Sequence, residues 1–264
     1  MVNRISELFS RKDKEVLSIY FTAGFPKLTD TNKILSSLCS RGADMIEIGM
    51  PYSDPLADGP VIQNSSMHAL ENGMSIKVLF EQLEEFSKTA TSECKKTPLI
   101  LMGYLNPVLQ FGFEKFCTTA SSLGIDGIIL PDLPIIEYEK EYKKILDQNN
   151  LSFIFLITPE TSEERICKID ELSTGFIYAV SSSSITGSAT NIQAQQDYFQ
   201  RIKNMNLKNN VLIGFGIRDR QTFTAACKHA TGAIIGTAYI NAIAQSGDIE
   251  KTTSSFLNSI LDKG

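Results

Sequence analysis

The sequence predicts an α/β fold, a closed (β/α)8 barrel of the TIM type, as a single domain over residues 1–264 with an extra N-terminal helix. Three observations predict this fold. Eight apolar runs alternate with helical patterns, as in parallel strands joined by right-handed crossovers. The 264 residues, 42% of them hydrophobic, suffice for one large core. No change of composition marks a linker, and eight such units fit a closed barrel better than an open doubly wound sheet.

The elements follow one another in a regular order. The first residues predict an amphipathic helix, with Ile5, Leu8 and Phe9 on the face that would cover the barrel floor. The expected strands are 17–24, 45–49, 99–104, 127–130, 152–157, 175–180, 211–215 and 233–236. The expected helices between them are 29–41, 60–72, 76–89, 113–123, 136–149, 162–169, 197–205 and 219–228. Two further helices, 239–245 and 249–261, would complete the outer ring.

Charge and hydropathy exclude several classes of protein. The net charge is −5 and the pI is about 5.2, with no basic stripe for nucleic acid or an anionic membrane. The N-terminus contains no long apolar run, and no window reaches the roughly 18 apolar residues of a membrane span. We expect a cytoplasmic protein.

The cysteines and histidines indicate neither a disulfide framework nor a metal site. The five cysteines are odd in number and widely separated, with no CxxC pair, so free thiols are expected. His68 and His229 are the two histidines that could assist a metal, and no metal site is predicted. The cysteines are Cys39, Cys94, Cys117, Cys167 and Cys227.

Two carboxylates flank one strand-to-helix loop in the segment ADMIEIGMPYSDPLADGPVIQ, residues 43–63. Glu47 lies within the strand, on the side opposite Ile46 and Ile48, and is expected to be desolvated. Such burial raises a carboxyl pKa and suits a general acid and base, although a purely structural role is the alternative. Asp58 precedes Gly59, where the next helix begins, so it is either functional or an N-cap.

The other candidate residues also follow strands, at the C-terminal face where barrel enzymes hold their active sites. They are Asn106, Asp132, residues 181–186, GFGI at 214–217 and IIGTA at 234–238. The glycines after the last two strands predict a phosphate site built from backbone N–H groups. Alternatively, Gly214 and Gly216 relieve crowding inside the barrel.

Four motifs together resemble the tryptophan synthase alpha subunit family, over essentially the whole chain. They are DMIEIGMPYSDPLADGPVIQ at 44–63, LPDLP at 130–134, ITG at 185–187 and GFGI at 214–217. The resemblance implies a carbon–carbon lyase of tryptophan biosynthesis, which cleaves indole-3-glycerol phosphate to indole and D-glyceraldehyde 3-phosphate. It implies no metal or organic cofactor in this subunit. It also implies a beta subunit carrying pyridoxal phosphate, in an alpha2-beta2 heterotetramer.

The resemblance also implies roles for residues. Glu47 is similar to the family's general acid and base, and Asp58 to the carboxylate that binds the indole N–H. Phe21, Leu101, Ile129 and Tyr178 match positions that wall the indole pocket, with core packing as the alternative. Residues matching the lid and the phosphate cradle are Thr186, Gly187, Phe215, Gly216, Gly236 and Thr237.

Two positions depart from the family pattern. Ser184 stands where the lid loop usually has glycine, and a Cβ there would restrict the backbone and slow closure. Thr237 stands where serine is more common, and it keeps a hydroxyl donor for phosphate.

The loops after the second, third and fourth strands are expected to bind the partner. Asp54, Asn106 and Asp132 lie there among prolines, and Asp54 and Asp132 would couple the partner's state to closure of the lid at 181–190. Alternatively, these residues only form the turns of ordinary loops and have no role in binding. Two rival functions remain at this point: another phosphate-binding barrel enzyme, and a weakly active regulatory subunit.

Overall fold

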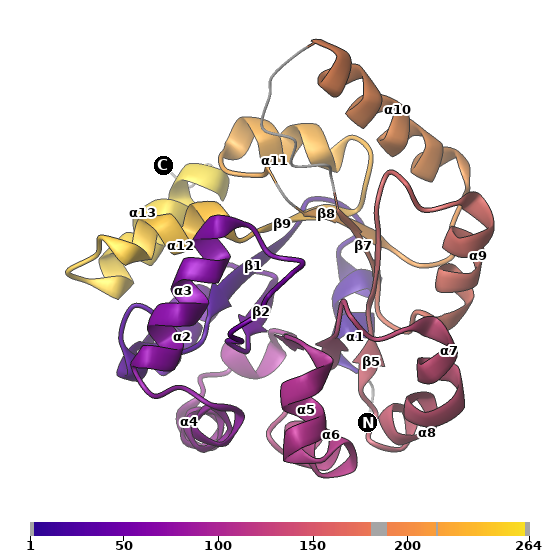
Figure 1. Ribbon diagram of the computed structural model, residues 1–264. Helices are drawn as coiled ribbons and strands as arrows, with labels where there is room; N and C mark the ends of the chain where they lie inside the picture. The colour runs from indigo at the N-terminus through magenta and orange to yellow at the C-terminus, as the bar shows by residue number, and fades with distance from the viewer. Residues whose placement is uncertain (1–2, 181–188, 215, 262–264) are drawn as a thin grey trace.

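A nearly closed ring of parallel strands lies inside a layer of helices (Figure 1). The computed structural model describes residues 3–180, 189–214 and 216–261. Its strands follow the order β5-β4-β3-β2-β1-β9-β8-β7-β6, and every neighbouring pair is parallel. The predicted (β/α)8 barrel is therefore confirmed.

The strands lie within a few residues of their expected positions, except that one is divided. They are β1 (Val16–Thr22), β2 (Met45–Gly49), β3 (Leu99–Met102), β4 (Gly127–Ile129), β5 (Ser152–Phe153), β6 (Phe155–Ile157), β7 (Ile177–Val180), β8 (Val211–Gly214) and β9 (Gly232–Ile235). The expected strand 152–157 appears as β5 and β6. Its first half pairs with β4 and its second half with β7, while the Ile154 N–H between them donates to the carbonyl of Ile128 at 3.1 Å. The chain changes neighbours there, which brings the two ends of the sheet together.

The helices form the outer layer and alternate with the strands. They are α1 (Arg4–Arg11), α2 (Thr31–Arg41), α3 (Pro60–Glu71), α4 (Ile76–Thr89), α5 (Leu105–Phe111), α6 (Phe113–Ser122), α7 (Ile135–Glu137), α8 (Lys143–Gln148), α9 (Glu163–Leu172), α10 (Ala189–Asn204), α11 (Arg220–Cys227), α12 (Thr237–Ala244) and α13 (Ile249–Leu261). The expected helix 136–149 is interrupted by a π-helical turn at Tyr138–Tyr142, and α10 begins eight residues before the expected start. None of the helices in the described ranges is both long and apolar enough to cross a bilayer.

The helix α5 was not predicted, and this corrects the expected position of Asn106. Asn106 and Pro107 were placed in a loop after β3, whereas they occupy the first turn of α5. Proline is tolerated there because the first N–H groups of a helix have no partner within the helix. Both carboxylate oxygens of Asp132, in the loop after β4, accept from the N–H of Leu105, at 2.9 and 3.0 Å.

The helix α1 closes the end of the barrel at which the strands begin, as predicted. Ile5 and Leu8 are fully buried, and Phe9 packs edge-on against Phe176. Arg4 pairs with the carboxylate of Asp126, directly before β4, with Nε at 2.9 Å from Oδ1. Apolar burial and one ion pair thus hold α1 across the floor.

Candidate active site

Glu47 lies in the middle of β2, fully buried, with Tyr20 opposite it on β1. The hydroxyl of Ser18 donates to its Oε1 at 2.7 Å. Its Oε2 is buried and has no hydrogen-bond partner among the described residues. Burial raises the pKa of Glu47 to about 7, against the smaller opposite effect of the Ser18 bond. The carboxyl is therefore able to hold or release a proton near neutral pH.

Asp58 lies in the loop after β2 and binds a side chain rather than the following helix. Gly59 is the N-cap of α3, without a side-chain bond, so Asp58 is not its N-cap. The Tyr104 hydroxyl donates to Asp58 Oδ2 at 2.9 Å and accepts from the N–H of Ala57 at 3.0 Å. Burial raises the pKa of Asp58 to about 6, and the Tyr104 bond lowers it in part. At pH 7 Asp58 is thus mostly ionised, whereas Glu47 is divided between its two forms.

A cavity opens beside Asp58, at the ends of β8 and β9. It is lined by Tyr20, Asp58, Ile62, Met102, Tyr178, Gly216, Ile217, Ile234, Gly236 and Thr237. Five of these were predicted individually from the sequence, and Ile217 and Ile234 belong to the predicted GFGI and IIGTA motifs, whereas Tyr20, Ile62 and Met102 were missed. Burial raises the pKa of Tyr178, and the negative charges of Glu47 and Asp58 raise it further, so both acids lie near this wall.

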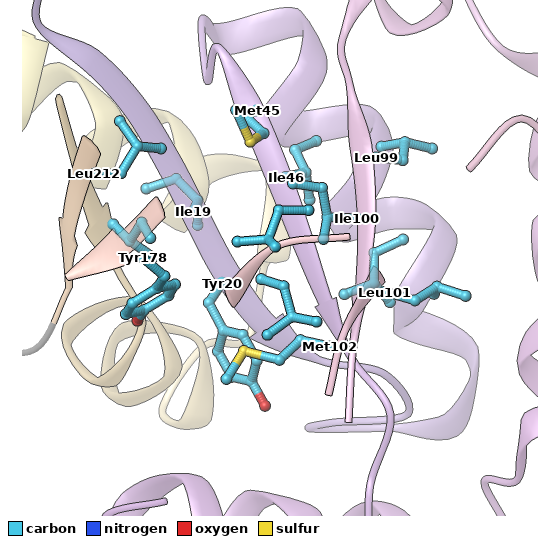
Figure 2. Close-up of a cluster of buried hydrophobic side chains, with 14 of the residues drawn as sticks. Ile19, Tyr20, Met45, Ile46, Leu99, Ile100, Leu101, Met102, Tyr178 and Leu212 are labelled. Carbon is cyan, nitrogen blue, oxygen red and sulfur yellow. The ribbon is translucent and has the colours of Figure 1, made fainter. Parts of the chain in front are cut away.

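The structure shifts two predicted wall positions by one residue. Phe21 and Leu101 are fully buried but do not line the cavity, and neither does Ile129. Neighbouring residues of a strand point to opposite sides, so Tyr20 and Met102 face inward where Phe21 and Leu101 do not. Figure 2 shows Met102 across the ring of Tyr20, with Leu101 on the other side of β3. The alternation of β1 and β3, counted from Glu47 on β2, could have indicated this from the sequence.

Two glycines make room for the tyrosines of the cavity. A Cβ on Gly49 would lie 2.1 Å from the Tyr20 hydroxyl oxygen, and one on Gly214 would lie 2.2 Å from that of Tyr178. Both distances are impossible without displacing a ring. Gly214 therefore relieves crowding, the alternative that the sequence left open.

The ends of β8 and β9 offer backbone N–H groups to the cavity. Gly216 has a φ of +74°, a conformation that favours glycine, and a Cβ there would meet nothing within 4 Å. Gly236 is the N-cap of α12 and has no side-chain cap, so the first N–H groups of that helix remain available beside Thr237. This arrangement is typical of phosphate sites.

Some predicted residues lie outside the described ranges, namely Thr186, Gly187, Phe215 and the lid residue Ser184. Within those ranges, no three histidine, cysteine or acidic side chains are grouped so as to hold a metal. All five cysteines are free. The residues predicted to bind the partner, Asp54, Asn106 and Asp132, are all exposed at the same end of the barrel as Asp58.

Comparison with known proteins identifies the family. The family model of the tryptophan synthase alpha chain matches residues 7–261. The alpha chain of Phocaeicola vulgatus is 51% identical, over 98% of this chain and 99% of its own length. The crystal structure of the Legionella pneumophila alpha chain aligns with a TM-score of 0.87 at 33% identity, over 99% of this chain and 97% of that one. A chain of the Pyrococcus furiosus tryptophan synthase complex aligns with a TM-score of 0.83 at 32% identity, over 95% and 99%. The protein therefore belongs to the tryptophan synthase alpha chain family.

Proposed function

We propose that Glu47 and Asp58 divide the work of the family's reaction, the cleavage of indole-3-glycerol phosphate to indole and D-glyceraldehyde 3-phosphate. The observation that carries this proposal is the different setting of two carboxyls whose pKa values burial raises: Glu47 is fully buried and keeps Oε2 without a hydrogen-bond partner among the described residues, whereas Asp58 lines the cavity and accepts from Tyr104. Different surroundings allow one acid to carry a proton while the other stays charged.

Each acid has a distinct step. Glu47 donates a proton to C3 of the indole ring, which leaves a positive charge spread towards the ring nitrogen. Asp58 accepts a hydrogen bond from the ring N–H and stabilises that charge. The bond from C3 to the side-chain carbon then breaks and its electrons return to the ring, while the hydroxyl on that carbon becomes a carbonyl. Glu47 accepts the hydroxyl proton, which returns it to its starting form.

The phosphate group is proposed to bind at the opposite end of the cavity. Gly216, Gly236 and Thr237 line that end, and the N-terminus of α12 adds a favourable dipole for an anion. Tyr20, Met102 and Tyr178 would pack against the indole ring between the two polar ends. The chemistry uses protein side chains alone, so we propose that this subunit needs no cofactor.

Conservative substitutions of the two acids test the assignment. Glu47→Gln keeps the shape of the side chain and is expected to lower kcat by about 10²- to 10⁴-fold, with substrate still bound. Asp58→Asn is expected to act mainly on kcat, because its charge is needed most in the transition state. Turnover of the purified chain, alone and with its partner, is the measurement. Near-normal turnover by Glu47→Gln would refute its role, and an effect of Asp58→Asn confined to KM would reduce Asp58 to a binding residue.

The partner is the tryptophan synthase beta chain, proposed to carry pyridoxal phosphate and to form a cytoplasmic alpha2-beta2 heterotetramer. The surface that supports docking comprises the segments after β2, β3 and β4. Large apolar side chains are exposed there, Leu56 at 94%, Ile136 at 62% and Leu109 at 45%. The predicted interface residues are exposed on the same segments: Asp54, Asn106 and Asp132. Exposed apolar side chains within a polar rim are typical of a protein interface.

A further inference from the structure

A buried serine on β1 contacts the proposed proton carrier. Ser18 lies on β1, two residues before Tyr20 and therefore on the same side of the strand. Its side chain is fully buried, and its hydroxyl donates to Glu47 Oε1 at 2.7 Å. Glu47 is fully buried as well, so no bulk water can replace this donor.

We propose that Ser18 is a positioning residue for proton transfer, which holds Oε1 of Glu47 so that Oε2 is the oxygen that exchanges the proton with substrate. The inference rests on the proposed role of Glu47. A hydrogen bond from Ser18 to Oε1 persists whether Oε2 is protonated or not, because Oε1 is an acceptor in both states. The free Oε2, without a partner among the described residues, is then available to the reacting carbon and hydroxyl.

The same bond sets the range of pH over which Glu47 works. Hydrogen bonds to a carboxylate favour its charged form, and the Ser18 bond lowers the pKa of Glu47 against the larger effect of burial. The titratable groups that interact with it are Tyr20 on β1 and Tyr178 on β7, and Asp58 interacts with the same two tyrosines, while β3 places Ile100 beside Glu47. Burial raises the pKa of both tyrosines, so they stay neutral while Glu47 titrates. The Ser18 bond thus opposes the rise in the pKa of Glu47 that desolvation causes.

The test compares Ser18→Ala, which removes the donor, with Ser18→Thr, which keeps it. Ser65→Ala is the matched control, because Ser65 is equally buried but bonds to Thr22 and not to an acid. The titration of Glu47 is followed by NMR of 13C-labelled glutamate carboxyls, with the signal assigned by its loss in Glu47→Gln. Initial rates are measured over the same pH range, and thermal unfolding shows whether each variant is folded.

Ser18→Ala is expected to move the Glu47 midpoint upward from about 7 by about one pH unit, a tenfold change in its ionisation equilibrium. The kcat of this variant is expected to fall about tenfold with little change in KM, since a proton carrier loses its orientation. Ser18→Thr and Ser65→Ala are expected to keep the wild-type midpoint. An unmoved midpoint in folded Ser18→Ala would overturn the inference, and so would an equal shift in Ser65→Ala. A moved midpoint with unchanged rates would also overturn the positioning role of Ser18, whereas near-normal turnover by Glu47→Gln would overturn the catalytic role of Glu47 itself.

Discussion

The two acids differ because their surroundings differ: Asp58 lines the cavity, whereas Glu47 is fully buried on β2 beside Tyr20, a residue of the cavity wall. Glu47 has one serine donor inside a strand of the barrel, whereas Asp58 has a tyrosine donor at the mouth. The sequence predicted the burial of Glu47 from its apolar neighbours on β2. It did not predict Ser18 or Tyr104, because each is more than 25 residues from its acid along the chain and meets it only when neighbouring strands pair.

Tyr104 is expected to control the acidic limit of activity. Its hydrogen bond lowers the pKa of Asp58, so Tyr104→Phe raises that pKa above about 6. Activity requires charged Asp58 and is lost as pH falls through its pKa, so the acidic limb of kcat/KM moves to higher pH, by about one pH unit at most. Rate profiles between pH 5 and 8 measure this. Tyr52→Phe is the control, because the Tyr52 ring packs on Tyr104 at 5.2 Å while Asp58 receives its bond from Tyr104. A limb that stays in place in Tyr104→Phe, or moves equally in both variants, would contradict this role.

Among the elements, α12 is expected to supply the phosphate site through its N-terminus. Gly236→Asp places a negative charge at the N-cap, where it repels phosphate, while Gly236→Asn has nearly the same size without the charge. A Cβ at this position lies 3.3 Å from Tyr20 Cδ1, so both variants share the same steric cost. We expect Gly236→Asp to bind an indole glycerol phosphate analogue at least about tenfold more weakly than Gly236→Asn.

Ligand binding can be followed directly by indole fluorescence, because the chain contains no tryptophan. Equal affinities of Gly236→Asp and Gly236→Asn for the phosphate analogue would show that the phosphate does not bind at the N-terminus of α12. Thermal unfolding of both variants controls for their shared steric effect.

Element boundaries were predictable where the signal is local. The strand β2 and the helices α4 and α13 lie at the expected residues, because apolar periodicity and nearby capping residues define them. The helix α5 was missed because Asp132, the residue that binds its first turn, comes from another loop. The division of 152–157 was missed for a similar reason, since the change of partner at Ile154 depends on both neighbouring strands.

At the scale of the whole molecule, the exposed apolar residues on the catalytic face are expected to bind the partner. Leu56→Ser is expected to reduce the activation by the beta chain by about tenfold or more, since the change removes the apolar burial of a side chain that is 94% exposed in the isolated chain. The same substitution is expected to change the cleavage rate of the chain without its partner much less. Co-elution and cleavage rates, with and without the beta chain from the same organism, are the measurements. Met67→Ser is the control, because Met67 is also exposed, at 45%, but lies in the second half of α3, away from the loop between β2 and α3 that holds Leu56.

Asp132 tests the coupling between the two chains. Asp132→Ala should reduce activation more than it reduces the unpartnered rate, although it also removes the bond to the N–H of Leu105. Asp54→Ala, which leaves α5 intact, separates these two effects. Activation that survives Leu56→Ser and both aspartate variants would place the interface elsewhere.

The helix α1 closes one end of the barrel, so ligands enter and leave the barrel at the opposite end. Ile5 and Leu8 fill the end where the strands begin, and Arg4 is tied to Asp126 at its edge. A small apolar product released inside the barrel consequently departs by the mouth through which the substrate arrived, the side on which the partner is proposed to sit. The same geometry makes the N-terminus a suitable point of attachment: a tether fused before α1 would immobilise the enzyme with its mouth turned towards solution, open to both ligand and partner.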